Sequence, residues 1–285
     1  MKDFHFDHVD AARETLAGRV IRTPVLPLCS NKLTPYLPPD CAMFMKLELF
    51  QHTGSFKARG ALLGVDWLDE DMRTSGVAGF SGGNFALALA WAAQQNNVPA
   101  KVVMSKAADP LRINGCRDLG AEVVLVDGIA AAMPELDRIK AEEGRKILHP
   151  FNDLNMACGA ATCGAEFIED VPDLEIVILP VGGGGLISGM AAAIKRQRPD
   201  ITIIGVEPVG ADSLSRSFRS GAPEVLDKVD TIADSLGAPM AMAESLALAR
   251  QYVDELIQIE DSVMARTMLL MRERLTLMAE PACAA

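Results

Sequence analysis

Short apolar runs alternate along the chain with longer segments in which apolar residues recur at helical spacing. The short runs predict strands at 42–47, 77–80, 101–104, 121–126, 146–148, 175–181, 201–206 and 255–259. The longer segments predict helices at 56–72, 84–95, 110–119, 129–143, 155–170, 185–198 and 244–252, and Asp261 is expected to cap a final helix. Strands that alternate with helices form parallel sheets with helices on both faces, so the pattern predicts an α/β protein.

One stretch without charged residues, 176–194, is nearly long enough to cross a bilayer. Pro180 and the four glycines at 182–185 interrupt it halfway. A strand, a turn and a helix start therefore explain this stretch better than a membrane span. The first ten residues alternate charged and apolar side chains, so no secretory signal is predicted.

Composition is that of a globular protein. Of the 285 residues, 49% are hydrophobic and 23% are charged, and the net charge is −11. An acidic surface repels phosphate backbones, so nucleic-acid binding is not expected, and no basic amphipathic helix offers a membrane contact. The six cysteines are scattered without the spacing of a zinc site, which favours a reduced, cytoplasmic location.

Lys57 lies in the segment 51–61, directly after a Thr-Gly-Ser turn and at the start of a predicted helix. Small and aromatic neighbours surround it, so partial burial is expected. Burial disfavours the charged amine, lowers its pKa and leaves a nucleophile that can form a Schiff base. Taken alone, the pattern also fits an ordinary exposed lysine on a helix.

Two glycine-bearing loops join strands to helices, where ligands of α/β proteins bind. In the loop 180–186, four glycines let consecutive backbone N–H groups point at one anion at a helix N-terminus, which predicts phosphate binding rather than a flexible turn. The G-x-G-x-x-G spacing and the Walker lysine are missing, which disfavours a dinucleotide or a nucleoside triphosphate. In the loop 81–85, Ser81 and Asn84 can hydrogen-bond a ligand, although a helix N-cap would explain the same residues.

Together these motifs closely resemble the serine/threonine dehydratase-like family of fold type II pyridoxal-phosphate enzymes, over nearly the whole chain. The matching segments are Thr23-Pro24, Ser55-Phe56-Lys57 with Arg59-Gly60-Ala61, Ser81 with Gly83-Asn84, Gly159-Ala160-Ala161-Thr162, the glycines at 182–185, Gly205-Val206-Glu207-Pro208, Thr231-Ile232-Ala233-Asp234 and Glu280-Pro281-Ala282. The resemblance implies a tryptophan synthase β-like fold with two doubly wound domains and mostly parallel sheets. Residues 1–75 plus 151–285 would form the large, cofactor-binding domain, and residues 76–150 the small one.

The resemblance also implies roles for the residues of these motifs. Lys57 would hold pyridoxal 5′-phosphate as a Schiff base and remove the α-proton of the substrate. The phosphate would be bound by Gly182, Gly183, Gly184, Gly185 and Leu186. Asn84 would bond the 3′-oxygen of the ring, and Phe56 would pack beside the ring. The substrate carboxylate would be bound by the loop Ser81-Gly82-Gly83-Asn84-Phe85.

Loss of a β-hydroxyl from the substrate then gives a 2-oxoacid and ammonia. The resemblance therefore implies a lyase of amino-acid metabolism that acts on a β-hydroxy amino acid, most simply L-threonine or L-serine. A cytoplasmic homodimer with a small-molecule substrate is expected, without nucleic-acid or membrane partners.

The chain departs from the family pattern at two positions of the substrate loop. Phe85 stands where a histidine is usual. Its ring would either make the substrate pocket more apolar or pack into the core beneath the helix. Gly82 stands where serine racemases carry a second serine, the base for the opposite face of the substrate.

Two further departures concern a metal site and the end of the chain. Ser213 stands where metal-binding relatives have an aspartate, so a divalent site at Glu207 and the Ala211 carbonyl, the weak metal candidates, would lack one carboxylate. The sequence ends at Ala285, before the last strand, in which the family carries a Ser or Cys that faces the pyridine nitrogen.

Three other functions stay open. An amino-acid racemase needs a proton donor on the face opposite Lys57, which Gly82 does not supply. A β-replacement enzyme of the cysteine-synthase type has a different segment after its lysine motif. A degenerate protein that binds the cofactor without turnover would fit a chain that lacks the last strand.

Overall fold

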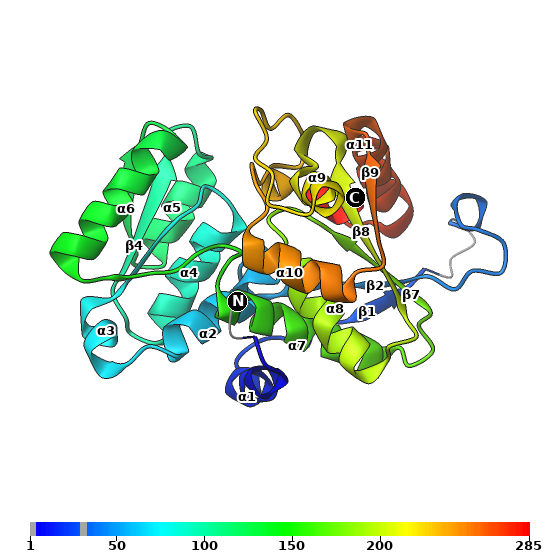
Figure 1. Ribbon diagram of the computed structural model, residues 1–285, viewed down its shortest axis with the longest axis horizontal. Coiled ribbons are helices and arrows are strands. Elements are labelled where there is room, and N and C mark those ends of the chain that lie inside the picture. Colours follow the sequence, from blue (N-terminus) through cyan, green and yellow to red (C-terminus); the bar gives the residue numbers. More distant parts are fainter. Residues whose placement is uncertain (1–3, 29–32) are drawn as a thin grey trace.

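The structure is a computed structural model that describes residues 4–28 and 33–285 (Figure 1). The helices are α1 (Phe6–Leu16), α2 (Lys57–Asp66), α3 (Glu70–Ser75), α4 (Asn84–Gln95), α5 (Pro110–Asp118), α6 (Ile129–Glu143), α7 (Leu154–Asp170), α8 (Gly185–Gln197), α9 (Ser213–Ser220), α10 (Ala243–Tyr252) and α11 (Asp261–Leu270). The strands are β1 (Val25–Pro27), β2 (Phe44–Lys46), β3 (Val77–Phe80), β4 (Ala100–Ser105), β5 (Glu122–Val126), β6 (Lys146–Ile147), β7 (Ile176–Pro180), β8 (Thr202–Pro208) and β9 (Glu255–Ile259). Two short 3-10 helices matter below, η5 (Asp234–Leu236) and η7 (Pro281–Ala284).

The described strands form three sheets. A parallel sheet with the order β5-β4-β3-β6 lies in the left half of Figure 1, and a parallel sheet with the order β7-β8-β9 lies in the right half. The predicted α/β fold with parallel sheets is therefore confirmed. The first sheet comes from residues within 76–150 and the second from residues within 151–285, although the division into two domains stays a prediction. The strand predicted at 42–47 pairs antiparallel with β1, outside both parallel sheets.

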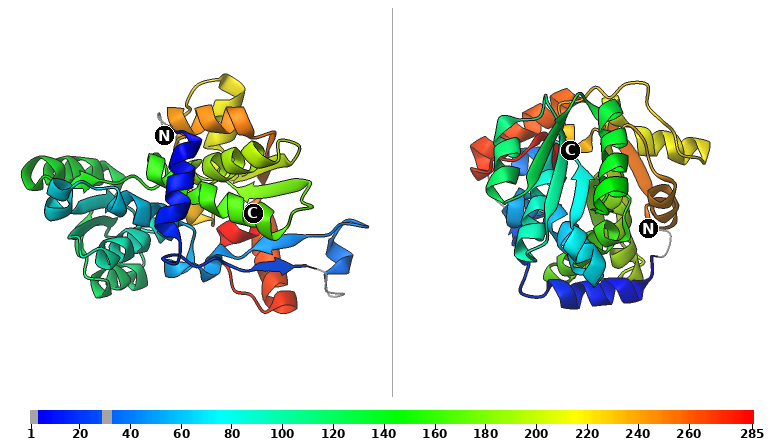
Figure 2. Two further views of the ribbon diagram at one scale, coloured as in Figure 1. Left: turned by 90° about the horizontal axis from the view of Figure 1, so that it is seen from below. Right: turned by 90° about the vertical axis from the view of Figure 1, so that its left-hand side faces the viewer.

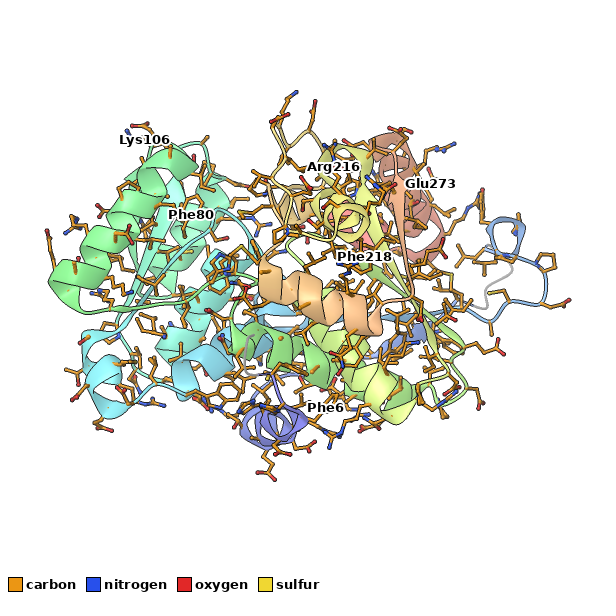
Figure 3. All side chains as sticks on the ribbon, viewed as in Figure 1. Phe6, Phe80, Lys106, Arg216, Phe218 and Glu273 are labelled. Atoms are coloured by element: carbon orange, nitrogen blue, oxygen red, sulfur yellow. The ribbon has the colours of Figure 1, made fainter. Side chains whose placement is uncertain are left out.

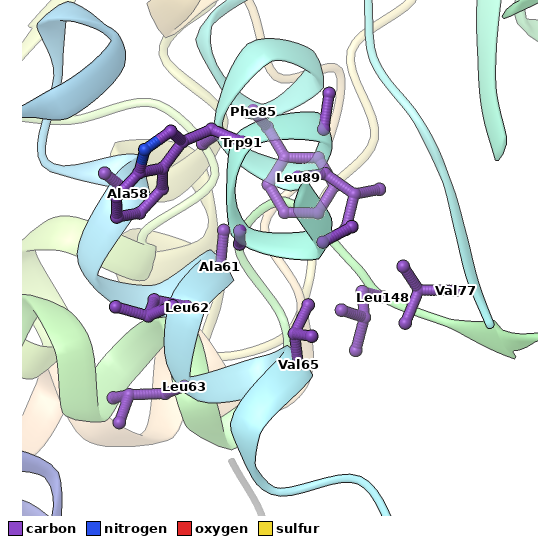
Figure 4. Close-up of a cluster of buried hydrophobic side chains, with 14 of the residues drawn as sticks. Ala58, Ala61, Leu62, Leu63, Val65, Val77, Phe85, Leu89, Trp91 and Leu148 are labelled. Carbon is purple, nitrogen blue, oxygen red and sulfur yellow. The ribbon is translucent and has the colours of Figure 1, made fainter. Parts of the chain in front are cut away.

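Apolar helices fill the space between the sheets and beside them. The residues Ala58, Ala61, Leu62 and Val65 of α2 are all buried, as their helical spacing predicts. They pack with side chains of α4, most of whose residues between Phe85 and Ala93 are buried (Figure 4). The helix α1 lies across the molecule and packs against α2 and α7 (Figure 2).

Two predicted helix features are wrong. The helix predicted at 56–72 is broken, because the Asp69 carboxylate accepts a hydrogen bond from the Met72 N–H at 2.8 Å and starts a new helix, α3. Asp261 does not cap α11, whose N-cap is Glu260. The Asp261 carboxylate instead accepts hydrogen bonds from the Thr231 hydroxyl and the Ile232 N–H.

The strand β7 forms one edge of its sheet. Its side chains Ile176 and Ile178 are 53% and 52% exposed, so the described residues leave one face of this edge strand uncovered. The uncharged stretch at 176–194 is β7, a loop and α8, as predicted. Within 4–28 and 33–285, no helix has both the length and the apolar character that a membrane crossing needs.

Candidate active site

The start of α2 and the loops that follow β3, β6 and β7 line one cleft of about 2570 Å³. These loops meet because the carboxyl ends of parallel strands face the same side of a sheet. A site for one small molecule typically occupies about 300–1,000 Å³, so the cleft has room for a cofactor and a substrate together. Every predicted cofactor-binding and substrate-binding residue, from Phe56 and Lys57 through 81–85 to 182–186, borders this cleft.

Lys57 is the first residue of α2, and its ammonium donates a hydrogen bond to the carbonyl oxygen of Pro150. The Lys57 Nζ lies 4.7 Å from the centre of the Phe56 ring. Burial lowers the pKa of this amine to about 7, as its sequence surroundings predict. A large fraction of the amines is therefore neutral, and able to accept a proton or attack a carbonyl, near neutral pH.

Arg59 anchors the helix that carries Lys57, a role that the sequence alone does not predict. Its guanidinium is fully buried and bonds the Glu48 carboxylate at 2.9 Å and the Glu166 carboxylate at 2.7 and 2.8 Å. Burial opposes the charge of Arg59, but the hydrogen bonds that it donates to Glu166 and Glu48 outweigh this effect and raise its pKa. The start of α2 is thus tied to α7 and to Glu48, two residues after β2, by a buried charge whose loss of either partner would be costly.

The glycines Gly60 and Gly159 set the distance between α2 and α7. A Cβ placed on Gly159 would lie 2.4 Å from the Gly60 nitrogen, and one on Gly60 would lie 2.8 Å from the Met156 Cα. The Asn155 amide adds a hydrogen bond to the Gly60 carbonyl at 2.8 Å. Close backbone packing therefore explains both glycines of the sequence motifs. It also fixes the position of α2, and with it Lys57, relative to α7.

The four-glycine loop is packed so closely that a side chain at any of its positions would need its neighbours to move. A Cβ on Gly183 would lie 2.3 Å from the Phe151 ring, and one on Gly182 or Gly185 would lie 3.0 Å from backbone atoms. Gly184 has φ +85°, which side chains disfavour. The loop is thus a shaped turn rather than a flexible one, and the first N–H groups of α8 point out of it without partners inside the helix.

The loop 149–153, after β6, joins the lysine to the glycine loop, and sequence reasoning missed it. Pro150 accepts the hydrogen bond from Lys57, and the next residue, Phe151, packs on Gly183. His149 Nδ1 accepts the N–H groups of Phe151 and Asn152 at 3.3 and 3.1 Å. Burial, helped by the charge of Lys57, lowers the pKa of His149 to about 4, so this ring is neutral and carries its proton on Nε2. A sequence signal was present in the His-Pro-Phe-Asn-Asp run directly after a strand.

The loop 81–85 offers the cleft backbone N–H groups and the side-chain amide of Asn84. The Ser81 hydroxyl accepts the Gly83 N–H at 3.1 Å and so shapes the turn into α4. The first N–H groups of α4 have no acceptor within the helix and are available to a carboxylate. The Phe85 side chain is 2% exposed and points into the core beside Leu89 (Figure 4). The structure therefore favours the core alternative for Phe85, whose ring is almost wholly covered although the residue borders the cleft.

The weak metal candidates lie outside this cleft. Glu207 is fully buried, and its two oxygens accept the N–H groups of Leu214 and Ser215 at 2.9 and 2.7 Å. Burial raises the pKa of this carboxyl to about 7. Glu207 thus caps the start of α9, next to the buried Ala211, and no group of three His, Cys, Asp or Glu side chains in the described residues could hold a metal.

Three buried polar atoms in or beside residues that line the cleft have no hydrogen-bond partner among the described residues: Ser55 Oγ at the lining, and Asn152 Oδ1 and Ser245 Oγ next to lining residues. Ser55 precedes the Phe56-Lys57 pair, Asn152 follows Phe151, and the Ser245 Cβ lies 2.9 Å from where Gly184 would carry one. An unpaired buried polar atom costs about 1–3 kcal/mol, which a polar ligand can recover. With the glycine loop and Lys57, these atoms fit the phosphate, ring substituents and carbonyl of pyridoxal phosphate.

Comparison with known proteins places this site in a family. A family model described as "Pyridoxal-phosphate dependent enzyme" matches residues 17–285. The phenylserine dehydratase of Ralstonia pickettii is 45% identical over 246 residues, which are 86% of this chain and 76% of that protein. The L-threonine ammonia-lyase of Thermotoga maritima is 38% identical over 84% of this chain, and the match spans only 60% of that enzyme.

Solved structures of similar proteins also superpose on the chain. Maize serine racemase is 33% identical and superposes with a TM-score of 0.93, over 98% of this chain and 83% of the racemase. The similar proteins thus include both dehydratases and racemases, and the fold of the chain is that of fold type II enzymes.

Proposed function

Because the chain belongs to the family of pyridoxal-phosphate-dependent enzymes, we propose that it is a dehydratase that converts a β-hydroxy amino acid to a 2-oxoacid and ammonia. The single observation that carries the proposal is the Lys57 amine, with a pKa of about 7, placed between two loops that expose backbone N–H groups. Dehydration needs a base for the α-proton and an anchor for the carboxylate, and this arrangement offers both.

The bound cofactor supplies an electron-withdrawing ring that stabilises the negative charge left when the α-proton is removed. The residues of the chain bind and orient the cofactor and the substrate. The glycine loop and the start of α8 hold the phosphate, and the start of α4 holds the substrate carboxylate. Lys57 accepts the α-proton, and its hydrogen bond to Pro150 fixes where its nitrogen lies when no cofactor is bound.

For the substrate, we propose that threonine and larger β-hydroxy amino acids such as phenylserine are preferred to serine. Phe80, Phe151 and Leu236 adjoin the loops after β3, β6 and β7 and border the same cleft; Figure 3 shows Phe80 in the left half of the molecule. A buried apolar substituent gains about 0.8 kcal/mol per carbon, a gain that serine forgoes. Two similar proteins carry the names phenylserine dehydratase and L-threonine ammonia-lyase.

The test is 2-oxoacid release from phenylserine, threonine and serine by the wild type and by Lys57→Ala, with the enantiomers of the remaining substrate separated by chiral chromatography. We expect release by the wild type, in that order of kcat/KM, and none by Lys57→Ala. Formation of the D-enantiomer without 2-oxoacid would identify a racemase instead. Cofactor binding without any turnover would identify a non-catalytic binder.

A further inference from the structure

The side-chain amide of Asn84 is held between two charged groups from distant parts of the chain. Its Nδ2 donates to Glu280 Oε1 at 2.8 Å, and its Oδ1 accepts from Arg112 Nη1 at 2.7 Å. Arg112 lies on α5, and Glu280 directly precedes η7. Glu280 is held in turn by the Ser235 hydroxyl at 2.9 Å and lies 3.7 Å from Arg112. All four residues border the cleft that contains Lys57.

These two neighbours permit only one orientation of the Asn84 amide. A guanidinium has only donors, so the atom that faces Arg112 must be the oxygen, and a carboxylate accepts, so the atom that faces Glu280 must be the nitrogen. A flipped amide would set donor against donor and acceptor against acceptor and would lose two charge-assisted hydrogen bonds. Nδ2 carries two hydrogens, and one of them stays available to a ligand in the cleft.

We propose that Arg112 is a positioning residue, which holds Asn84 so that Nδ2 remains a donor toward the 3′-oxygen of the bound cofactor. The proposal rests on the proposed function, because it assumes that Asn84 contacts the cofactor. Arg112 acts through Asn84 and does not itself touch the reacting atoms. Without Arg112, the amide keeps only its bond to Glu280, and that single contact allows it to rotate.

The experiment is a double-mutant cycle read by the dissociation constant of pyridoxal phosphate and by the visible absorbance of the bound cofactor. Both Arg112→Met and Asn84→Ala are expected to weaken cofactor binding by about tenfold, the cost of one such hydrogen bond. The double variant is expected to bind no more weakly than Asn84→Ala alone, because Arg112 then has nothing to position. Arg112→Lys, which retains one donor group, is expected to restore part of the affinity.

Arg117→Met is the matched control, since it removes an exposed arginine from the same helix. Losses that add in the double variant, or an Arg112→Met variant that binds like this control, would overturn the proposal. Neither readout requires turnover. A protein that bound the cofactor but dehydrated no substrate would therefore refute the proposed function and still allow the test of Arg112. A wild type that bound no cofactor would overturn both.

Discussion

Replacing Gly183 with alanine tests whether close packing at the glycine loop holds the site together. The new Cβ would lie 2.3, 2.4 and 2.6 Å from three ring carbons of Phe151, so the ring or the loop must move by about 1 Å to reach a normal contact. Overpacking of this kind costs about 1–3 kcal/mol. Since Phe151 follows Pro150, the movement also disturbs the carbonyl that accepts the Lys57 hydrogen bond.

The assay is urea unfolding of the cofactor-free protein, together with the dissociation constant of pyridoxal phosphate. For Gly183→Ala we expect the free energy of unfolding to fall by about 1–3 kcal/mol and the affinity to fall by about tenfold or more. Gly82→Ala is the matched control, because a Cβ there would meet only the Ala108 Cβ, at 3.4 Å. Adding Phe151→Leu to Gly183→Ala should recover part of the stability. A Gly183→Ala variant that matched the control in both stability and affinity for pyridoxal phosphate would refute the reasoning.

Three further substitutions test other parts of the structure. Glu166→Ala should lower the free energy of unfolding by about 3–5 kcal/mol, because it removes one of two carboxylates from the buried Arg59. Glu169→Ala removes two exposed ion pairs, with Arg13 and Arg22, and should cost less than about 2 kcal/mol. Equal losses in urea unfolding would contradict this. Gly82→Ser has room for its hydroxyl and should increase D-enantiomer formation on chiral chromatography, and an unchanged trace would mean that position 82 does not face the substrate. Phe85→His should cost about 2–4 kcal/mol of stability in the core without changing the threonine-to-serine ratio of kcat/KM, and a changed ratio would place the ring in the pocket.

The bounds of some elements could be predicted to the residue from the apolar pattern. The bounds of β3, α4 and α6 agree with the sequence pattern, and α6 continues through Pro134, its sixth residue, although a proline there leaves the Ala130 carbonyl without its helical N–H partner. The prediction from the pattern omitted α1, α9 and the short β1. The break between α2 and α3 was missed because the Asp69 cap competes with a helical period that continues past it.

The parts of the site that could be predicted are local in sequence. For the lysine after a Thr-Gly-Ser turn and the four glycines after a strand, the neighbouring few residues are enough to predict the role. The partners of these motifs are distant. Pro150 is 93 residues from Lys57, and Glu280 is 196 residues from Asn84, so only the fold brings them together. The orientation of Phe85 was undecided for the same reason, because its neighbours in the core come from other elements.

The most direct test of the site is to identify which lysine carries the cofactor, and at which pH it becomes reactive. The protein is incubated with one equivalent of pyridoxal phosphate at a series of pH values, reduced with borohydride and mapped by mass spectrometry. We expect the pyridoxyl group on Lys57, with labelling that rises with pH and is half-maximal near pH 7, because only the neutral amine reacts and the pKa of Lys57 is about 7. An ordinary lysine would label increasingly up to a pH of about 10.4. A pyridoxyl group on another lysine, or labelling of Lys57 without a plateau above its pKa, would contradict the assignment.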